Sequence, residues 1–127
     1  MAPGISILLV DDDPLIRSLG RDLLEHLGYQ VETAQDGPEA LQCYRRQPRI
    51  DLVILDYNLP GQTGLEVLQK LKDLDPQARV LVASGDFSSQ LVKILEEGGV
   101  VGFIHKPFRV WELETRIKMV LAGVSGG

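Results

Sequence analysis

The chain has 127 residues, of which 44% are hydrophobic and 24% are charged, and its 13 basic and 18 acidic side chains give a formal net charge of −5. This composition excludes disordered and collagen-like proteins and fits a single domain over residues 1–127, with its core at 5–121 and a flexible tail or linker start at 122–127. The acidic balance disfavours direct contact with nucleic acid. One cysteine, no signal-peptide pattern and no membrane-length apolar run predict a cytoplasmic protein with no membrane partner.

Five apolar runs along the chain predict five strands. The first, over residues 5–10, is apolar throughout, as expected of a strand that is covered on both faces. The other predicted strands are 29–34, 52–55, 79–83 and 100–104. Each run is followed by hydrophobic residues at helical spacing, so strands and helices are expected to alternate.

Five amphipathic helices are predicted after these strands. The first has Asp13 as its N-cap and Pro14 in its first turn, and it ends at Gly28. Its predicted buried stripe is Ile16, Leu19, Leu23 and Leu27. Two further helices are expected over 38–47 and 64–74. The fourth is expected to turn inward Phe87, Leu91, Ile94 and Leu95, and the last to bury Val110, Leu113, Ile117 and Leu121.

Alternating strands and helices with connections this short predict an α/β fold, a parallel sheet with helices on both faces. In such a fold the carboxyl ends of the strands share one edge, and ligands bind outside that edge. The residue types that carry chemistry follow the predicted strands at Asp11, Asp12, Asp56, Ser84 and Lys106. We therefore expect these side chains to meet in one cleft.

The predicted cleft combines three carboxylates, a lysine and a hydroxyl. The carboxylates of Asp11, Asp12 and Asp56 would repel one another if no cation lay among them. Hard oxygen ligands suit Mg²⁺, and the chain has no cysteine and histidine cluster for zinc. A lysine and a hydroxyl beside the metal would bind a tetrahedral dianion, and Asp56, fixed at a strand end, can act as the nucleophile that receives a phosphoryl group.

Four segments at these strand ends resemble the motif blocks of the response-regulator receiver domain. The segments are Val10–Pro14, Asp51–Gly61, Ala83–Gly85 and Lys106–Phe108. In order and spacing the resemblance covers residues 5–121. It implies a doubly wound five-stranded sheet of flavodoxin-like order 2-1-3-4-5, and a domain of a two-component or phosphorelay system that catalyses its own phosphorylation and dephosphorylation. It also implies a histidine kinase or a phosphotransfer protein as the phosphoryl donor.

The resemblance also implies a role for each site residue. The implied Mg²⁺ ligands are Asp11, Asp12, Asp56 and the backbone carbonyl of Asn58. Asp56 would be the phospho-acceptor, and Lys106 would contact the phosphoryl group. Ser84 would be the switch hydroxyl, and Phe103 the aromatic side chain that follows it inward.

Some positions depart from the commonest family pattern, among them Tyr57 after the acceptor, and two others bear on the phosphoryl lifetime. Ser84-Gly85 stands where threonine-alanine is more usual, and Thr63 stands where aspartate is frequent, which we expect to affect the order of the loop after the acceptor. Asn58 and Asp86, each two residues beyond a reactive group, are expected at the mouth of the cleft, where they would orient an attacking water. A short-lived phosphoryl group is predicted.

A partner surface is predicted on the face formed by the fourth helix, the fifth strand and the fifth helix. The helical angle of Trp111 places it away from the core, so we expect it to be exposed, with Lys118 on the same face. This face would contact a downstream protein, an output domain on another chain or beyond residue 127, or a second copy of this chain after phosphorylation.

Two other functions are consistent with parts of the pattern. A phosphatase that uses an Asp-x-Asp pair after its first strand would need Asp11 and Asp13, but it expects a hydroxyl where Leu15 stands. A pseudo-receiver would bind partners without phosphorylation. The presence of all the key side-chain types argues against it.

Overall fold

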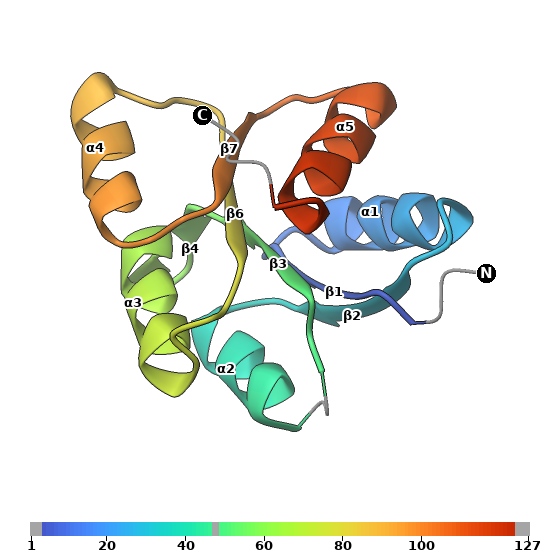
Figure 1. The fold of residues 1–127 in the computed structure, drawn as a ribbon, viewed down its shortest axis with the longest axis horizontal. Coiled ribbons are helices and arrows are strands. Elements are labelled where there is room, and N and C mark those ends of the chain that lie inside the picture. The colour runs from blue at the N-terminus through green and yellow to red at the C-terminus, as the bar shows by residue number, and fades with distance from the viewer. Residues whose placement is uncertain (1–3, 47–48, 124–127) are drawn as a thin grey trace.

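The computed structural model describes residues 4–46 and 49–123, and it confirms the predicted α/β fold (Figure 1). Five parallel strands form one sheet in the order β2-β1-β3-β6-β7. These strands are β1 Ser6–Val10, β2 Gln30–Ala34, β3 Leu52–Asp56, β6 Val80–Ser84 and β7 Gly102–His105. Numbered among themselves in chain order, they have the order 2-1-3-4-5, so the flavodoxin-like arrangement is confirmed.

Five helices of the described chain cover the two faces of this sheet. They are α1 Pro14–His26, α2 Gly37–Arg46, α3 Gly64–Leu74, α4 Ser89–Glu97 and α5 Val110–Leu121. Helices α1 and α5 pack on one face, and α2, α3 and α4 on the other (Figure 1). None of the helices in the described ranges combines the length and hydropathy that a membrane crossing needs.

The alternation of side chains along each strand divides the core into two layers. In β1, Leu8 and Val10 pack with α2, α3 and α4, while Ile7 and Leu9 pack with α1 and α5. Every residue of β1, β3 and β6 is buried, because both faces of these strands are covered. Because both faces are covered, the sequences of these strands contain continuous apolar runs.

The buried face of α1 differs from the predicted stripe. Ile16 is 37% exposed and Leu19 is 56% exposed, whereas Leu24, outside the stripe, is fully buried. The reason is Gly20, where an added Cβ would lie 2.6 Å from Cδ2 of Leu9. The helix turns its glycine to the sheet and approaches it closely there, so the predicted stripe is wrong at Ile16 and Leu19, whereas Leu23 does pack against the core.

Two other predicted core residues are exposed. Val110 is the first residue of α5, and the buried face of that helix is formed by Leu113, Ile117 and Val120. Ile94 is exposed on α4 beside the buried Leu95. Each lies on the border of its helix's apolar stripe, where a change in the helix rotation decides burial.

A short hairpin that the sequence did not predict follows β3 directly. It pairs β4 (Asn58–Leu59) with β5 (Gln62–Thr63) in antiparallel register. Pro60 and Gly61 form its turn, and Gly61 has φ of +76°, a value that favours glycine. Thr63 is the N-cap of α3 in a capping box with Glu66. The sequence predicts that Thr63 affects the order of this loop, and in the structure Thr63 caps the helix that follows the loop.

Candidate functional site

Three carboxylates meet at the carboxyl ends of β1 and β3. Asp11 follows β1 and is 4% exposed, and Asp56 is the last residue of β3 and is 7% exposed. The parallel register that pairs Val10 with Leu55 brings the two strand ends together. One oxygen atom from each of Asp11, Asp12 and Asp56 lies within 4.8 Å of the others, and Asp12 is exposed to solvent. The predicted convergence of these three residues is present in the structure.

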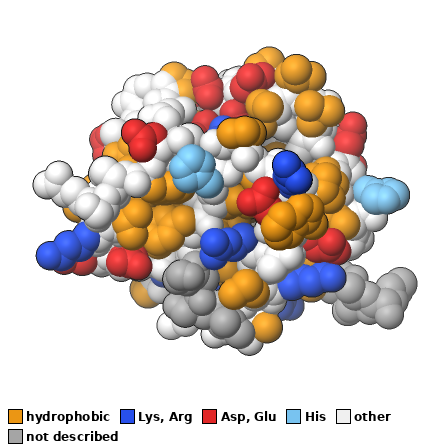
Figure 2. Space-filling view, turned by 90° about the horizontal axis from the view of Figure 1, so that it is seen from above, with side chains coloured by type: hydrophobic (Ala, Val, Ile, Leu, Met, Phe, Trp, Pro, Cys, Tyr) orange, Lys and Arg blue, Asp and Glu red, His pale blue; other side chains and the backbone are white. Residues whose placement is uncertain are grey.

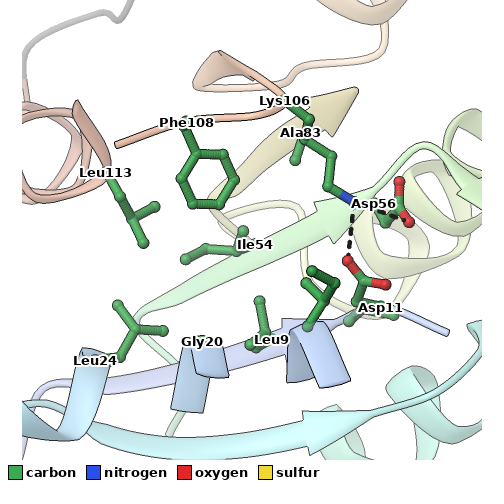
Figure 3. Close-up of a pocket in the computed structure, with 12 residues that line it drawn as sticks. Leu9, Asp11, Gly20, Leu24, Ile54, Asp56, Ala83, Lys106, Phe108 and Leu113 are labelled. Atoms are coloured by element: carbon green, nitrogen blue, oxygen red, sulfur yellow. Dashed lines mark hydrogen bonds and ion pairs between the residues drawn. The ribbon is translucent and has the colours of Figure 1, made fainter. Parts of the chain in front are cut away.

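Lys106 reaches this cluster from beyond the end of β7 (Figure 3). Its Nζ donates a 3.0 Å hydrogen bond to Oδ2 of Asp11 and lies 3.4 Å from Oδ2 of Asp56. Apolar side chains line the small cavity behind these charges, among them Leu9, Ile54 and Phe108 (Figure 3). The charged groups therefore lie beside an apolar surface, where interactions between charges are strong.

Burial and charge set the protonation of the site. Burial raises the pKa of Asp56 above its ordinary value, although the Lys106 ammonium and the backbone N–H of Asn58 act in the opposite direction. Burial lowers the pKa of Lys106, but the hydrogen bond to Asp11 and the charge of Asp56 outweigh it, so the net shift is upward. The Lys106 ammonium pairs with Asp11 and Asp56, and Asp12 lies beside them as a third carboxyl group. The excess negative charge and the all-oxygen donor set suit a divalent cation.

Asp13 has a structural role. Its Oδ1 accepts hydrogen bonds from the backbone N–H groups of Leu15 and Ile16 at the start of α1. It is the N-cap that the sequence predicts, and a carboxylate so used is a poor partner for Asp11 in the phosphatase alternative. Sequence reasoning missed Arg17, whose Nη1 donates a 2.8 Å hydrogen bond to the carbonyl of Asp11. Arg17 lies inside a helix, so a search of strand ends does not find it.

The hydroxyl of Ser84 is turned toward its own loop. Ser84 ends β6 beside β3, where Asp56 pairs with Ala83, and it is buried. Its Oγ donates to the carbonyl of Asp86 at 3.0 Å and accepts from the N–H of Asp86 at 3.2 Å. The structure thus places Ser84 at the predicted edge of the sheet, with its hydroxyl engaged by the backbone two residues further on.

Phe103, on β7, is partly buried against the core layer of α2, α3 and α4. Its ring meets that of Phe87 edge to face, with the centroids 5.3 Å apart and the planes at 75°. Phe87 lies in the loop between Ser84 and α4, so the loop that carries the hydroxyl also touches the predicted switch aromatic. The centroid of Phe87 is also 6.0 Å from that of His105.

The remaining predicted residues lie on the surface. The side chains of Asn58 and Asp86 are exposed, and the backbone N–H of Asn58 donates a 3.2 Å hydrogen bond to Oδ1 of Asp56. Trp111 is 62% exposed on α5, as expected, and Lys118 forms an ion pair of 3.2 Å with Glu114. Figure 2 shows hydrophobic side chains on the upper face of the molecule, interrupted by single charged groups.

Comparison with known proteins shows the family of this chain. A family model for the response regulator receiver domain matches residues 7–118. The chain is 33% identical over 115 residues to sporulation initiation phosphotransferase F of Bacillus subtilis, covering 91% of this chain and 92% of that protein. It is 35% identical over 118 residues to the probable transcriptional regulatory protein TcrX of Mycobacterium tuberculosis, covering 92% of this chain. The chain spans half of TcrX, and 6% of the peroxide stress-activated histidine kinase mak3 of Schizosaccharomyces pombe, to which it is 30% identical.

Solved structures show the same likeness in three dimensions. The chemotaxis protein CheY4 of Vibrio cholerae superposes with a TM-score of 0.87 at 31% identity, covering 91% of this chain and 97% of that one. The CheX-CheY-BeF3-Mg²⁺ complex of Borrelia burgdorferi contains a chain with a TM-score of 0.87 at 31% identity, covering 91% of this chain and 88% of that one.

Proposed function

Because the chain belongs to the response regulator receiver domain family, we propose that Asp56 accepts a phosphoryl group from a phosphohistidine on a histidine kinase or phosphotransfer protein. The observation that carries this proposal is the placement of Asp56. It is buried at the end of a central strand, with Lys106 at 3.4 Å and two further carboxylates beside it. A nucleophile in this position is fixed by the strand, and Asp12 beside it is exposed to solvent.

The residues present fit a Mg²⁺ ion. Asp11, Asp12 and Asp56 would hold it together with the backbone carbonyl of Asn58, as oxygen ligands of a hard cation. When bound, Mg²⁺ supplies positive charge to the carboxylates and to the phosphoryl oxygens. The related chain in the Borrelia burgdorferi complex was crystallised with BeF3 and Mg²⁺, which supports this choice of metal.

The transfer itself needs one nucleophile and one leaving group. A carboxylate oxygen of Asp56 attacks phosphorus, the P–N bond of the phosphohistidine breaks, and the imidazole nitrogen keeps the electron pair. The Lys106 ammonium, which pairs with Asp11 and Asp56 here, then also neutralises charge on the phosphoryl oxygens. Hydrolysis returns Asp56 and inorganic phosphate, and we assign the orientation of the attacking water to Asn58 and Asp86.

The switch follows from the present bonds of Ser84. To reach a phosphoryl oxygen, its hydroxyl must give up the carbonyl of Asp86, which moves the loop before α4. Phe87 belongs to that loop and touches Phe103, so the two rings must move together or separate. The coupling cannot exceed the difference in phosphoryl contacts between the two states.

The donor must bring its phosphohistidine to Asp56, so it must cover the surface around Lys106. An apolar groove of about 400 Å³ borders that lysine, lined by Ile16, Leu19, Leu23, Pro107 and Phe108. Its walls are α1 and the segment between β7 and α5. We assign this groove to the contact with the donor.

The output surface is proposed on α4, β7 and α5. Trp111 lines a second pocket there with His105, Glu112, Thr115, Arg116 and Met119, among others. An exposed tryptophan beside a pocket is the kind of side chain that dominates binding energy at protein interfaces. With Lys118 it would contact a downstream protein, an output domain, or a second phosphorylated copy of this chain.

Intact-mass analysis tests the central step. After incubation with Mg²⁺ and acetyl phosphate, the protein should gain about 80 Da, the mass of a phosphoryl group. The gain should disappear with EDTA and in Asp56→Asn. Phosphorylation of Asp56→Asn at the wild-type level would overturn the assignment of the acceptor, and a wild type that stays unmodified with all donors would favour a pseudo-receiver.

A further inference from the structure

Gln62 stands out because its side-chain oxygen is buried without a partner. Within the described residues, Oε1 of Gln62 is the single buried side-chain nitrogen or oxygen that makes no hydrogen bond. Leaving a buried carbonyl oxygen unpaired is costly, and such atoms are rare in native proteins. A hydrophobic side chain of the same length would fill the space without this cost.

The Gln62 side chain presses against the first residue of α2. A Cβ added to Gly37 would overlap Oε1 of Gln62, and it would lie 3.0 Å from Cδ of Gln62 and 2.9 Å from Cγ2 of Val67 on α3. The space for Gln62 therefore exists because residue 37 is a glycine. The side chain connects β5 to the start of α2 at a point where a larger neighbour does not fit.

The hairpin that carries Gln62 also carries a proposed metal ligand. Gln62 pairs with Leu59, and Thr63 pairs with Asn58, whose N–H donates to Asp56. A hairpin of two residue pairs is marginal by itself and needs packing against the rest of the fold. Gln62 supplies such packing one pair away from Asn58.

We propose that Gln62 is a positioning residue that tunes Mg²⁺ binding. Its side chain, held against Gly37, fixes the hairpin and hence the backbone carbonyl of Asn58 beside Asp56. Its unpaired oxygen weakens this anchor, because the amide regains hydrogen bonds to water when the hairpin moves away from α2. The inference rests on the proposed function, in which Asn58 is a metal ligand, and Gln62 itself touches neither metal nor phosphoryl group.

Two substitutions separate the effect of the Gln62 packing from the effect of its unpaired oxygen. Gln62→Met keeps the packing and removes the unpaired oxygen, so it should tighten Mg²⁺ binding by about 5-fold, the lower end of what an unpaired buried group corresponds to. Gln62→Ala removes the packing and should weaken Mg²⁺ binding by a similar factor. Gly37→Ala should also weaken binding, and the double variant Gly37→Ala/Gln62→Ala should recover part of the loss because the overlap is gone.

Isothermal titration of the unphosphorylated protein with MgCl₂ measures these affinities without any enzymatic turnover. A second readout is phosphorylation by acetyl phosphate, where the Mg²⁺ concentration for half-maximal rate should shift while the rate at saturating Mg²⁺ stays that of the wild type. Val120→Ala, a core change in α5, is the matched control for a general loss of stability. It should leave the Mg²⁺ affinity unchanged.

The outcomes separate the inference from the proposed function. Wild-type Mg²⁺ affinity in both Gln62 variants, or an equal loss in Val120→Ala, would overturn the role of Gln62. A wild-type protein that does not bind Mg²⁺ would instead overturn the proposed metal site. The Gln62 variants decide the question even if Gly37→Ala does not fold, since they need no extra space.

Discussion

Nζ of Lys106 donates a 3.0 Å hydrogen bond to Oδ2 of Asp11, a contact between residues 95 positions apart in the sequence. It joins the end of β7, at one edge of the sheet, to the end of β1, three strands away. The same ammonium lies 3.4 Å from Asp56, so one side chain neutralises charge on two strand ends. Lys106 occupies the position from which it can both stabilise the phosphoryl group and repel a bound cation.

Lys106→Met should therefore separate metal binding from phosphorylation. Loss of the ammonium should slow phosphorylation by acetyl phosphate by at least about 10-fold. Removing one group that stabilises a transition-state charge typically lowers a rate by about 10²–10³. Mg²⁺ should bind more tightly, because a competing positive charge is gone. Lys70→Met, an exposed change on α3, is the control and should alter neither quantity. Weaker Mg²⁺ binding in Lys106→Met would contradict this account.

Ser84→Ala should affect the switch more than the phosphorylation. The substitution removes the two hydrogen bonds between Oγ and the backbone of Asp86, at a cost of about 1 kcal/mol in the free energy of unfolding. Asp56 should still gain a phosphoryl group, because the nucleophile and Lys106 are unchanged. The change in the NMR signals of Phe103 on phosphorylation should become smaller, and Ser84→Thr should restore it. A full Phe103 response in Ser84→Ala would show that the hydroxyl is not the link.

The residues at strand ends could be predicted from the sequence because their positions follow from the fold alone. A parallel sheet brings Asp11, Asp56 and Lys106 to one edge independently of how the helices pack, and the apolar runs mark where each strand ends. The direction of the Ser84 hydroxyl could not be predicted in this way. It depends on the local path of the loop at Asp86, for which the sequence carries no periodic signal.

Helix faces and short irregular elements were harder to predict for a related reason. Hydrophobic periodicity counts side chains, and Gly20 has none, so the close approach of α1 to Leu9 is invisible in the pattern. The hairpin after Asp56 consists of two short strands with a polar, half-buried residue, Gln62, whose side-chain oxygen is buried. A signal for the start of α3 was available in Thr63 and Glu66, which have the spacing of a capping box.

Leu19→Gln should slow transfer from a protein donor and leave a small-molecule donor unaffected. Leu19 lines the groove beside Lys106 and is largely exposed, so its substitution should not unfold the domain. The rate from a phosphorylated phosphotransfer domain should fall about 5-fold or more, which corresponds to one interface side chain worth at least about 1 kcal/mol, while the rate from acetyl phosphate stays constant. Leu74→Gln, an exposed leucine on α3, is the matched control. An equal loss with both kinds of donor would place the defect in the site and not in docking.

The contact between Tyr44 and Asp75 predicts how stability depends on pH. The Tyr44 hydroxyl donates a 2.7 Å hydrogen bond to Oδ2 of Asp75, linking α2 to the C-cap of α3. This bond, together with the N–H of Gln77, lowers the pKa of Asp75, while burial and the same bond raise the pKa of Tyr44. A carboxylate with a pKa lowered by folding stabilises the native state fully above its unfolded pKa of about 3.9, and this stabilisation is lost as the pH falls through the folded value.

Tyr44→Phe should therefore be less stable than the wild type at neutral pH, and the two should approach one another in stability as the pH falls below about 3.9, where Asp75 takes up a proton in both. Urea unfolding followed by circular dichroism at several pH values measures the difference. Tyr29→Phe removes a hydroxyl whose pKa is raised chiefly by burial, so its difference from the wild type should stay constant over the same range. A Tyr44→Phe difference that does not change with pH would mean that Tyr44 stabilises the protein by packing alone, because the hydrogen bond to a charged Asp75 is the one part of its contribution that acid removes.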